Sequence, residues 1–300
     1  MRTILTTGTD DFTIIDREAP EPRAGEVRIR VAAASVNPVD VGAAHGVFHR
    51  MGVIPAGAAV GLGWDVSGVV DAVGPDVAGL TTGTAVAGLR HGIGPDIGTY
   101  GEAVVLPANA VARLPRGLDP ADAAAVPLIA LTASQAIDLL NPGGRRLLIV
   151  GASGGVGGYA VPLAAQRGAT VTAVGKRGDV ENLIHHGADT VVTDVAELTD
   201  RRFDAVFDPA GAGAGLLDLL VDGGHYLGTA PRNAPAPVRG ITSGWIEVRA
   251  DGAELAGLLT EVAAGRLPLR IAGDFALDEA AKAHQAFEDK SIPGRWLLRI

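Results

Sequence analysis

The sequence predicts an α/β protein that combines a doubly wound parallel sheet with a β-rich region. Three observations carry this prediction. Short β-like runs fill the first hundred residues, strand and helix patterns alternate from about residue 119, and a glycine cluster follows a buried strand. Alternating strands and helices build a parallel sheet covered by helices. The 300 residues, 47% of them apolar, suffice for one large domain or two modest ones.

Charge and cysteine content exclude several classes of protein. The chain has 25 Lys and Arg against 34 Asp and Glu, so its net charge of -9 gives no general attraction to nucleic acid or anionic membranes. The absence of cysteine excludes disulfides, thiolate zinc sites and cysteine nucleophiles. The N-terminal residues contain no apolar run of signal-peptide length. We therefore expect a cytoplasmic protein that binds neither nucleic acid nor membrane.

The N-terminal part is predicted to be mainly β. Its apolar runs are interrupted by glycine and proline, as expected for short strands joined by turns. The runs are "EVRIRVAAASV" (26–36), "GLGWDVSGVVDAVG" (61–74), "TAVAGL" (84–89) and "YGEAVVLPA" (100–108).

A change of pattern near residue 119 predicts helices between strands. Residues 119–140 read as a helix with Asp119 as its cap and Pro120 in its first turn. Further helices are predicted at 180–187 and 214–224, each closed by a glycine that suits a C-terminal cap. Residues 275–300 predict an amphipathic helix and a final strand. The remaining strand candidates are 146–150, 170–174, 190–193, 205–209 and 224–230.

Residues 147–165 carry no charge and are long enough to raise the question of a membrane span. Five glycines and Pro162 lie in this run. The sequence "LLIV" followed by "GASGGVGG" fits a buried strand, a tight turn and the start of a helix better.

That turn predicts a dinucleotide-binding site. Glycines allow close approach of a ligand, and the N–H groups at the start of a helix attract a pyrophosphate. In the G-x-G-x-x-G pattern the first glycine is replaced by an alanine, but the turn lies between a strand and a helix of a βαβ unit. The predicted contacts are Gly151, Ala152, Ser153, Gly154, Gly155, Val156 and Gly157.

The end of the next strand favours NADPH as the cofactor. An NAD-binding chain carries an acid there to bind the ribose hydroxyls, whereas this chain has Gly175. Lys176 and Arg177 follow, and two cations suit the extra 2′-phosphate. Two alternatives stay open: the cations solvate a loop, or Asp179 binds a ribose.

Blocks outside this turn occur in a characteristic order. They are "SVNPVD" (35–40), "GWDVSGVVDAVG" (63–74), "GTYGEAVVLPA" (98–108), "AAAVPLIALTASQAI" (123–137) and "GRWLLRI" (294–300). In order and spacing the chain resembles the medium-chain dehydrogenase/reductase superfamily, and within it the zinc-independent quinone oxidoreductase-like branch. The resemblance implies a Rossmann NADP-binding domain, residues 118–266, inserted into a GroES-like β-rich catalytic domain, residues 1–117 and 267–300.

The resemblance also locates the catalytic zinc ligands of the zinc-dependent branch, which here fall on Asn37, Trp64 and Leu128. None of these side chains is a competent zinc ligand, so we expect no metal. His45 and His49 are four residues apart, but they lack an intervening glutamate and a third ligand. We interpret them as surface or pocket residues.

Without a metal, the acceptor of the hydride must carry its own activation. Quinones and α,β-unsaturated carbonyl compounds meet this requirement, and NADPH would supply the hydride. By resemblance, Asn37 and Asp40 face the substrate and nicotinamide and are the predicted catalytic pair. The alternative for Asp40 is that it caps or ties a loop.

The proton donor stays open, because related chains often carry a tyrosine where this one has Gly42. His45 and Tyr100 are the substitutes considered, against the alternative that each is a packing residue. Trp64 is predicted either to occupy substrate volume or to pack in the core. Loops 45–60 and 90–98 are expected to select the small-molecule substrate.

Further cofactor contacts follow from the resemblance, as does a homodimer. The predicted contacts are Thr132, Pro209, Ala210, Gly228 and Thr229. A different function also stays open, namely an NADP(H)-binding member of the fold that has no reductase turnover or serves a non-redox biosynthetic step.

Overall fold

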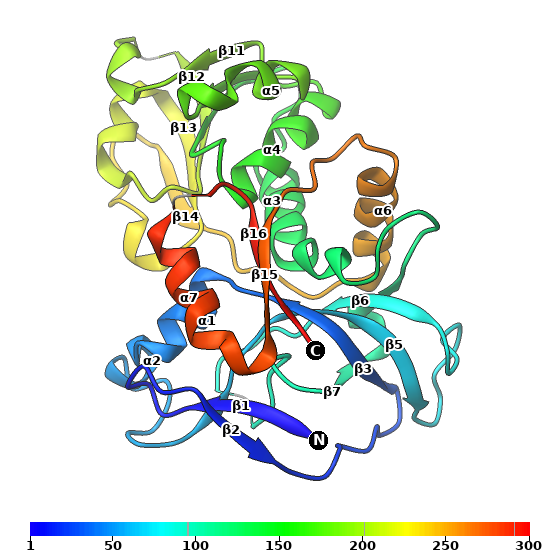
Figure 1. The fold of residues 1–300 in the computed structure, drawn as a ribbon. Helices are drawn as coiled ribbons and strands as arrows, with labels where there is room; N and C mark the ends of the chain where they lie inside the picture. The colour runs from blue at the N-terminus through cyan, green and yellow to red at the C-terminus, as the bar shows by residue number, and fades with distance from the viewer. Residues whose placement is uncertain (95, 201, 291) are drawn as a thin grey trace. The chain divides into compact units, whose positions relative to one another are not determined.

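A computed structural model describes residues 1–94, 96–200, 202–290 and 292–300 (Figure 1). The chain divides into two compact units. The first unit holds Met1–Leu128, Ala250–Ala264 and Leu269–Ile300, and the second holds Ile129–Arg249 and Gly265–Pro268. The domain limits drawn from the sequence, 117/118 and 266/267, stay predictions. Residues 250–264, which these predicted limits place in the inserted domain, belong to the first unit of the structure.

The second unit contains a parallel sheet of six strands in the order β11-β10-β9-β12-β13-β14. The doubly wound sheet predicted from the sequence is confirmed. The chain order reverses between β9 and β12, and open α/β sheets bind ligands at such a point. The strands are β9 (Arg146–Val150), β10 (Thr170–Val174), β11 (Thr190–Val192), β12 (Phe203–Asp208), β13 (Leu220–Gly228) and β14 (Thr242–Trp245). The helices of this part of the chain are α3 (Pro127–Leu140), α4 (Gly155–Gln166) and α5 (Val180–His185), with 3-10 turns η3 (Arg177–Asp179), η4 (Val195–Glu197), η5 (Gly213–Leu219) and η6 (Pro231–Asn233).

The first unit is built on two sheets, ordered β2-β1-β4 and β15-β16-β3-β5-β6-β8, with β7 paired to β3. The strands are β1 (Arg2–Thr6), β2 (Thr13–Asp16), β3 (Glu26–Ser35), β4 (Val60–Gly61), β5 (Asp65–Val73), β6 (Ala85–Leu89), β7 (Ala103–Pro107), β8 (Val111–Arg113), β15 (Ile271–Ala276) and β16 (Arg295–Arg299). The helices are α1 (Pro38–Ala44), α2 (Val47–Arg50), α6 (Gly252–Ala263) and α7 (Ala280–Asp289), with turns η1 (Ala108–Ala110), η2 (Asp122–Ala125) and η7 (Leu277–Glu279).

The C-terminal tail belongs to the β-rich unit. Strand β16 pairs antiparallel with β3, so that Leu297 lies opposite Ser35. In β3 the buried residues Val27, Ile29 and Val31 alternate with more exposed ones and pack against valines of β5 and β6. This alternation is the pattern by which one face of a strand enters a core.

Two predicted helices differ from the structure. Residues 119–140 form η2 and then α3, which begins at Pro127, because this proline lacks the N–H that one continuous helix would need at that position. Asp119 nevertheless caps this segment, since its Oδ1 accepts hydrogen bonds from the N–H groups of Ala121 (2.8 Å) and Asp122 (3.1 Å).

The helix predicted at 214–224 is wrong. Turn η5 ends at Leu219, and β13 starts at Leu220. Gly223 has a φ of 75° within the strand, where the register of β13 against β12 shifts. The glycine therefore marks an irregularity in a strand and does not cap a helix.

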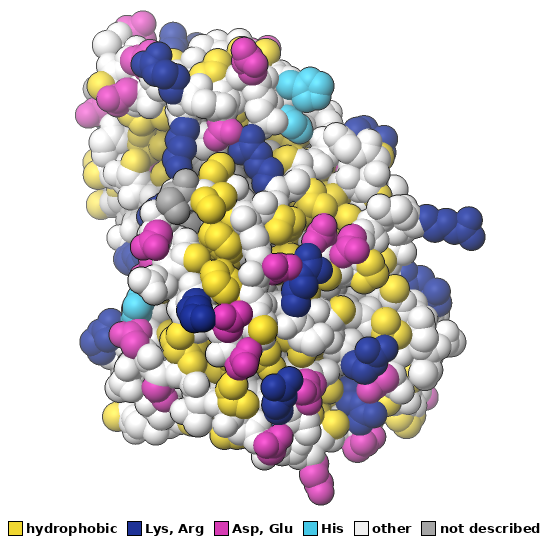
Figure 2. All heavy atoms as spheres, viewed as in Figure 1, with side chains coloured by type: hydrophobic (Ala, Val, Ile, Leu, Met, Phe, Trp, Pro, Cys, Tyr) yellow, Lys and Arg dark blue, Asp and Glu magenta, His cyan; other side chains and the backbone are white. Residues whose placement is uncertain are grey.

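The charge-free stretch 147–165 forms β9, a turn and most of α4. Helix α4 has 12 residues, and none of the described helices is both long and apolar enough to cross a membrane. Figure 2 shows acidic and basic side chains of the described residues interspersed over the visible face.

Candidate active site

The glycine-rich turn brings the start of α4 against the end of β9. Gly151 has a φ of 86°, a conformation that favours glycine. A Cβ at Gly157 would lie 2.3 Å from the carbonyl oxygen of Gly151, so no larger residue fits there. Gly154, the N-cap of α4, provides no side-chain cap, and both it and Gly155 are exposed. The first N–H groups of α4 are thus open to a pyrophosphate, and this cradle fits a dinucleotide.

A second loop of the same unit lies beside this turn. A Cβ on Gly151 would be 2.9 Å from the Cβ of Ala210, which follows β12. Buried Asp208 shapes this loop by accepting hydrogen bonds from the N–H groups of Gly211 and Gly213, both at 2.9 Å, and from the Tyr226 hydroxyl at 2.7 Å. Asp208 was not predicted from the sequence, although an acid that ends an apolar strand before several glycines is a usable signal.

Two side chains crowd the end of β10, so an acid at Gly175 would require them to move. A Cβ at Gly175 would lie 2.5 Å from Cδ1 of Leu183 and 3.0 Å from Oγ of Ser153. The same Oγ accepts a hydrogen bond from the backbone N–H of Lys176 at 2.8 Å. Lys176 and Arg177 are exposed, whereas Asp179 is buried at the start of α5.

The other predicted cofactor contacts lie in the second unit as well. Thr132 is buried in α3, Pro209 and Ala210 follow β12, Gly228 ends β13 and Thr229 follows it. Ala152 and Gly157 of the turn are buried, while Ser153 and Val156 are partly exposed. Their contacts with a cofactor stay predictions.

In the first unit, a buried ion pair organises the residues around Asn37. Asp65 accepts hydrogen bonds from Ser35 Oγ (2.5 Å), Asn37 Nδ2 (2.9 Å) and the Leu128 N–H (2.6 Å), and Arg295 lies 3.4 Å away. Arg295 also donates to Ser35 Oγ at 2.8 Å and to Asn37 Oδ1. Burial raises the pKa of the Asp65 carboxyl, and Arg295 is the main influence against that rise. The hydrogen bonds from Ser35, Asn37 and Leu128 act in the same direction as Arg295 and favour the Asp65 anion against that rise.

Asp40 lies beside this network without a cation of its own. It is the third residue of α1 and forms a capping box with Asn37: its Oδ2 accepts from the Asn37 N–H at 2.9 Å. Its Oδ1 accepts from the Gly63 N–H at 3.0 Å. Burial, followed by the negative charge of Asp65, raises the pKa of Asp40 from 3.8 to about 7. Both oxygens therefore have partners, yet the neutral acid is stable near neutral pH.

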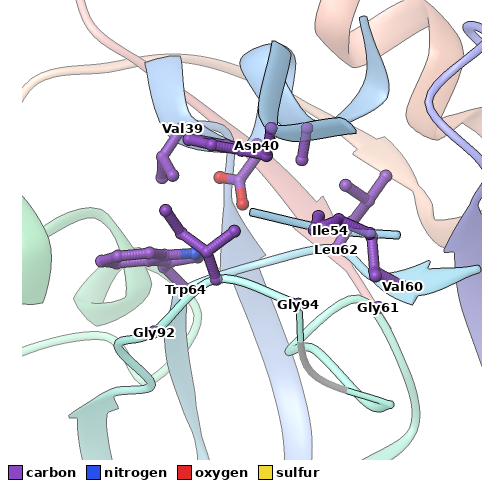
Figure 3. Close-up of a pocket in the computed structure, with 12 residues that line it drawn as sticks. Val39, Asp40, Ile54, Val60, Gly61, Leu62, Trp64, Gly92 and Gly94 are labelled. Carbon is purple, nitrogen blue, oxygen red and sulfur yellow. The ribbon is translucent and has the colours of Figure 1, made fainter. Parts of the chain in front are cut away.

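A pocket of the first unit opens beside Asp40. The space it leaves for a small molecule is about 10 Å³, roughly the room of one water molecule, and a wider region of about 250 Å³ includes open solvent. Figure 3 shows the carboxyl group of Asp40 turned toward the space between Trp64 and Ile54. The lining residues are Val39, Asp40, Ala43, Phe48, Ile54, Val60, Gly61, Leu62, Trp64, Gly92, Ile93 and Gly94. Both predicted substrate loops supply lining residues; Pro95 of the second lies outside the described residues.

Tyr100 and His45, the possible proton donors named from the sequence, do not line this pocket. Tyr100 is fully buried in the core, with its hydroxyl 3.2 Å from Nε2 of His284. His45 is partly exposed and lies between the carboxylates of Asp10 and Glu288, the latter at 2.9 Å. Trp64, by contrast, forms part of the pocket wall.

The positions that hold zinc in the zinc-dependent branch are otherwise engaged. The amide of Asn37 bonds Asp65 and Arg295, Trp64 lines the pocket, and Leu128 contributes its backbone N–H. Within the described ranges, no three His, Cys, Asp or Glu side chains form a group that would hold a metal ion. The residues present do not fit a zinc centre.

Comparisons with known proteins agree with this arrangement. Residues 23–116 match the alcohol dehydrogenase GroES-like domain, and residues 179–298 match the zinc-binding dehydrogenase family. A quinone oxidoreductase of Pseudomonas aeruginosa is 30% identical over 94% of this chain and 94% of its own length. The chain belongs to the medium-chain dehydrogenase/reductase superfamily, in its quinone oxidoreductase-like branch.

Other members of the superfamily support an oxidoreductase with a nicotinamide cofactor. A 2-methylene-furan-3-one reductase of Solanum lycopersicum is 29% identical over 93% of this chain and 73% of its own. The quinone oxidoreductase structure from Coxiella burnetii has a TM-score of 0.86 at 26% identity and covers 100% of this chain and 99% of its own. An NAD-dependent alcohol dehydrogenase structure has a TM-score of 0.83 at 28% identity, with 100% of both chains covered.

Replacing Arg295 should strongly destabilise this medium-chain dehydrogenase/reductase chain. Arg295→Met leaves the Asp65 anion buried without its cation, which should lower the free energy of unfolding by about 3–5 kcal/mol. Arg299→Met, in the same strand, removes a cation paired with Asp122 and Asp274 at an exposed position and should change it by less than about 1 kcal/mol. Urea unfolding measures both. Equal losses would contradict the role given to the buried pair.

The titration of Asp40 should lower the free energy of unfolding as pH rises. The folded chain keeps the Asp40 proton up to a pKa of about 7, whereas the unfolded chain releases it near 3.8. Between these values the folded state binds more protons, so the Asp40 contribution falls by up to about 1.4 kcal/mol per pH unit. Urea unfolding from pH 4 to 8 should show this slope in the wild type and not in Asp40→Asn.

Asp11→Asn is the matched control for that measurement. Asp11 also accepts backbone N–H groups, but hydrogen bonds from Thr7, Thr6 and Thr9 outweigh burial and lower its pKa to about 2. The control should therefore keep the wild-type slope above pH 4. A slope that survives in Asp40→Asn would show that another group causes it.

Proposed function

We propose that this chain is a zinc-independent, NADPH-dependent reductase that transfers hydride to a quinone or an α,β-unsaturated carbonyl compound. The observation that carries the proposal is the pocket beside Asp40, where Trp64 stands in the place of a zinc ligand. An acceptor bound there gains no polarisation from a metal, so it must be electron-poor itself. The names of two relatives, a quinone oxidoreductase and a furanone reductase, support these acceptor classes.

The proposed preference for NADPH over NADH rests on the residues that follow β10. Gly175 stands where a ribose-binding acid would be expected, and a Cβ there would meet the side chains of Leu183 and Ser153. The next two residues, Lys176 and Arg177, present exposed cations suited to a 2′-phosphate. Asp179 is buried, which argues against its use for a ribose hydroxyl.

When bound, the reduced nicotinamide supplies the hydride. In this proposal the first N–H groups of α4 bind the pyrophosphate, and the loop shaped by Asp208 contributes Pro209 and Ala210 as further contacts. Asn37 and Asp40 form the catalytic pair. In this proposal the acceptor lies against the apolar side chains at the solvent-open side of the pocket, including Trp64, and their exclusion of water strengthens its polar contacts.

Removing the two cations should separate the coenzymes. Lys176→Ala combined with Arg177→Ala should raise the KM for NADPH at least about tenfold and that for NADH less than about twofold, because only NADPH carries the 2′-phosphate. Steady-state kinetics with both coenzymes measures this. Arg145→Ala, an exposed cation just before the amino end of β9, is the control and should change neither KM. Equal increases for the two coenzymes would reject the assignment.

Stopped-flow loss of NADPH absorbance tests the reductase itself. The proposal expects oxidation of NADPH by 1,2-naphthoquinone or by a series of 2-alkenals. Tight binding of NADPH without turnover on any of these acceptors would contradict it and would favour a coenzyme-binding protein without reductase activity.

A further inference from the structure

The proposed reaction needs a proton in addition to the hydride. Addition of a hydride to a quinone gives a quinol oxyanion, and addition to an α,β-unsaturated carbonyl gives an enolate. Both anions must take up one proton to become the product. A positioned acid accelerates such a step when the anion is strongly basic.

The side chains considered from the sequence lie elsewhere. The Tyr100 hydroxyl faces His284 in the core, and burial, followed by the charge of Asp40, raises its pKa well above the usual value. The ring of His45 is engaged by Asp10 and Glu288. Gly42, at the position where related chains carry a tyrosine, has no side chain to offer.

Asp40 is the one ionisable residue among the described residues that line the pocket. The structure gives its carboxyl one backbone N–H donor on each oxygen, from Asn37 and from Gly63. Neither of these donors can accept a proton. A proton on the carboxyl is therefore available to a ligand on the side that faces the pocket (Figure 3).

The neighbouring charges leave this proton in place near neutral pH. Asp65 on β5 lies 3.4 Å from Arg295 on β16, so the cation of this network is already paired with another carboxyl group. A second anion at Asp40 would leave one uncompensated negative charge in the core. Tyr100, the remaining titratable group facing this network, stays neutral.

We propose that Asp40 is the proton donor of the reductase, a role that rests on the proposed function. The oxyanion or enolate formed by hydride addition takes the proton from the Asp40 carboxyl. The O–H bond of Asp40 breaks, a new O–H or C–H bond forms on the product, and Asp40 is left as a carboxylate. Both electrons of the reduction come with the hydride from NADPH, which becomes NADP⁺, and Asp40 regains its proton from solvent.

Two acceptors that differ in the basicity of their product anions separate proton donation from positioning. A 2-alkenal yields a strongly basic enolate, whereas tetrachloro-1,4-benzoquinone yields a weakly basic quinol anion that needs no acid. Asp40→Asn should lower kcat/KM for the alkenal about a hundredfold or more, and for the chlorinated quinone less than about fivefold. Equal losses with both acceptors would overturn the proposal. Asp11→Asn, a carboxylate away from the pocket, should leave both values unchanged.

The wild type gives the same test through its pH profile, which stays available if Asp40→Asn does not fold. The value of kcat/KM for the alkenal should fall as pH rises through about 7, where Asp40 loses its proton. The value for the chlorinated quinone should not follow this titration. A parallel fall for both acceptors would overturn the proposal.

Infrared spectroscopy supplies a readout that needs no turnover. With ¹³C-labelled aspartate, the wild type should show the C=O band of a neutral carboxyl group at about pH 6 that disappears by about pH 8 and is missing from Asp40→Asn. Absence of the band, in a wild type that reduces both acceptors, would overturn the role of Asp40 alone. Failure of the wild type to reduce either acceptor would overturn the proposed function and this role with it.

Discussion

The buried ion pair between Asp65 and Arg295 is the interaction on which the first unit's site depends. It joins β5 to the C-terminal strand, and Ser35 and Asn37 complete its hydrogen bonds. Buried pairs of this kind gain little net stability, because desolvation offsets their attraction, but they leave a large penalty when one partner is lost. In this protein the pair matters because it affects the protonation of the neighbouring Asp40 carboxyl group. Two buried carboxylates share one guanidinium, so Asp65 takes the cation and Asp40 keeps a proton.

The second unit depends on a constraint of a different kind, the absence of side chains. Glycine at 157 lets α4 start against the turn after β9, and glycine at 175 leaves room for Ser153 and Leu183. Because residue 157 has no side chain, α4 can begin where its first N–H groups are open to a pyrophosphate. Because residue 175 has none, no acid is present there to bind a ribose hydroxyl, and Lys176 and Arg177 are the next polar groups. We thus propose that the preference for NADPH follows from the close packing around the two glycines, Gly157 and Gly175.

Features encoded locally could be predicted from the sequence. The apolar run of β9, the glycines after it and the cap at Asp119 each depend on a few neighbouring residues, and the structure contains all three. The helix expected at 214–224 failed because its apolar spacing suits either a helix or a strand, and pairing of β13 with β12 and β14 decided for the strand. The role of Arg295 depends on a contact 230 residues away along the chain, which a single sequence cannot reveal. For the same reason Tyr100 and His45 were considered as proton donors, although their partners, His284 and Glu288, come from α7.

The central claim is that the two buried carboxylates of the first unit carry different charges at neutral pH. Neutron diffraction from crystals of the deuterated protein at about pH 6 would locate the deuterons directly. The account predicts a deuteron on the Asp40 carboxyl, directed into the pocket, and none on Asp65. Nuclear density on Asp65 instead, or on neither carboxyl group, would contradict it.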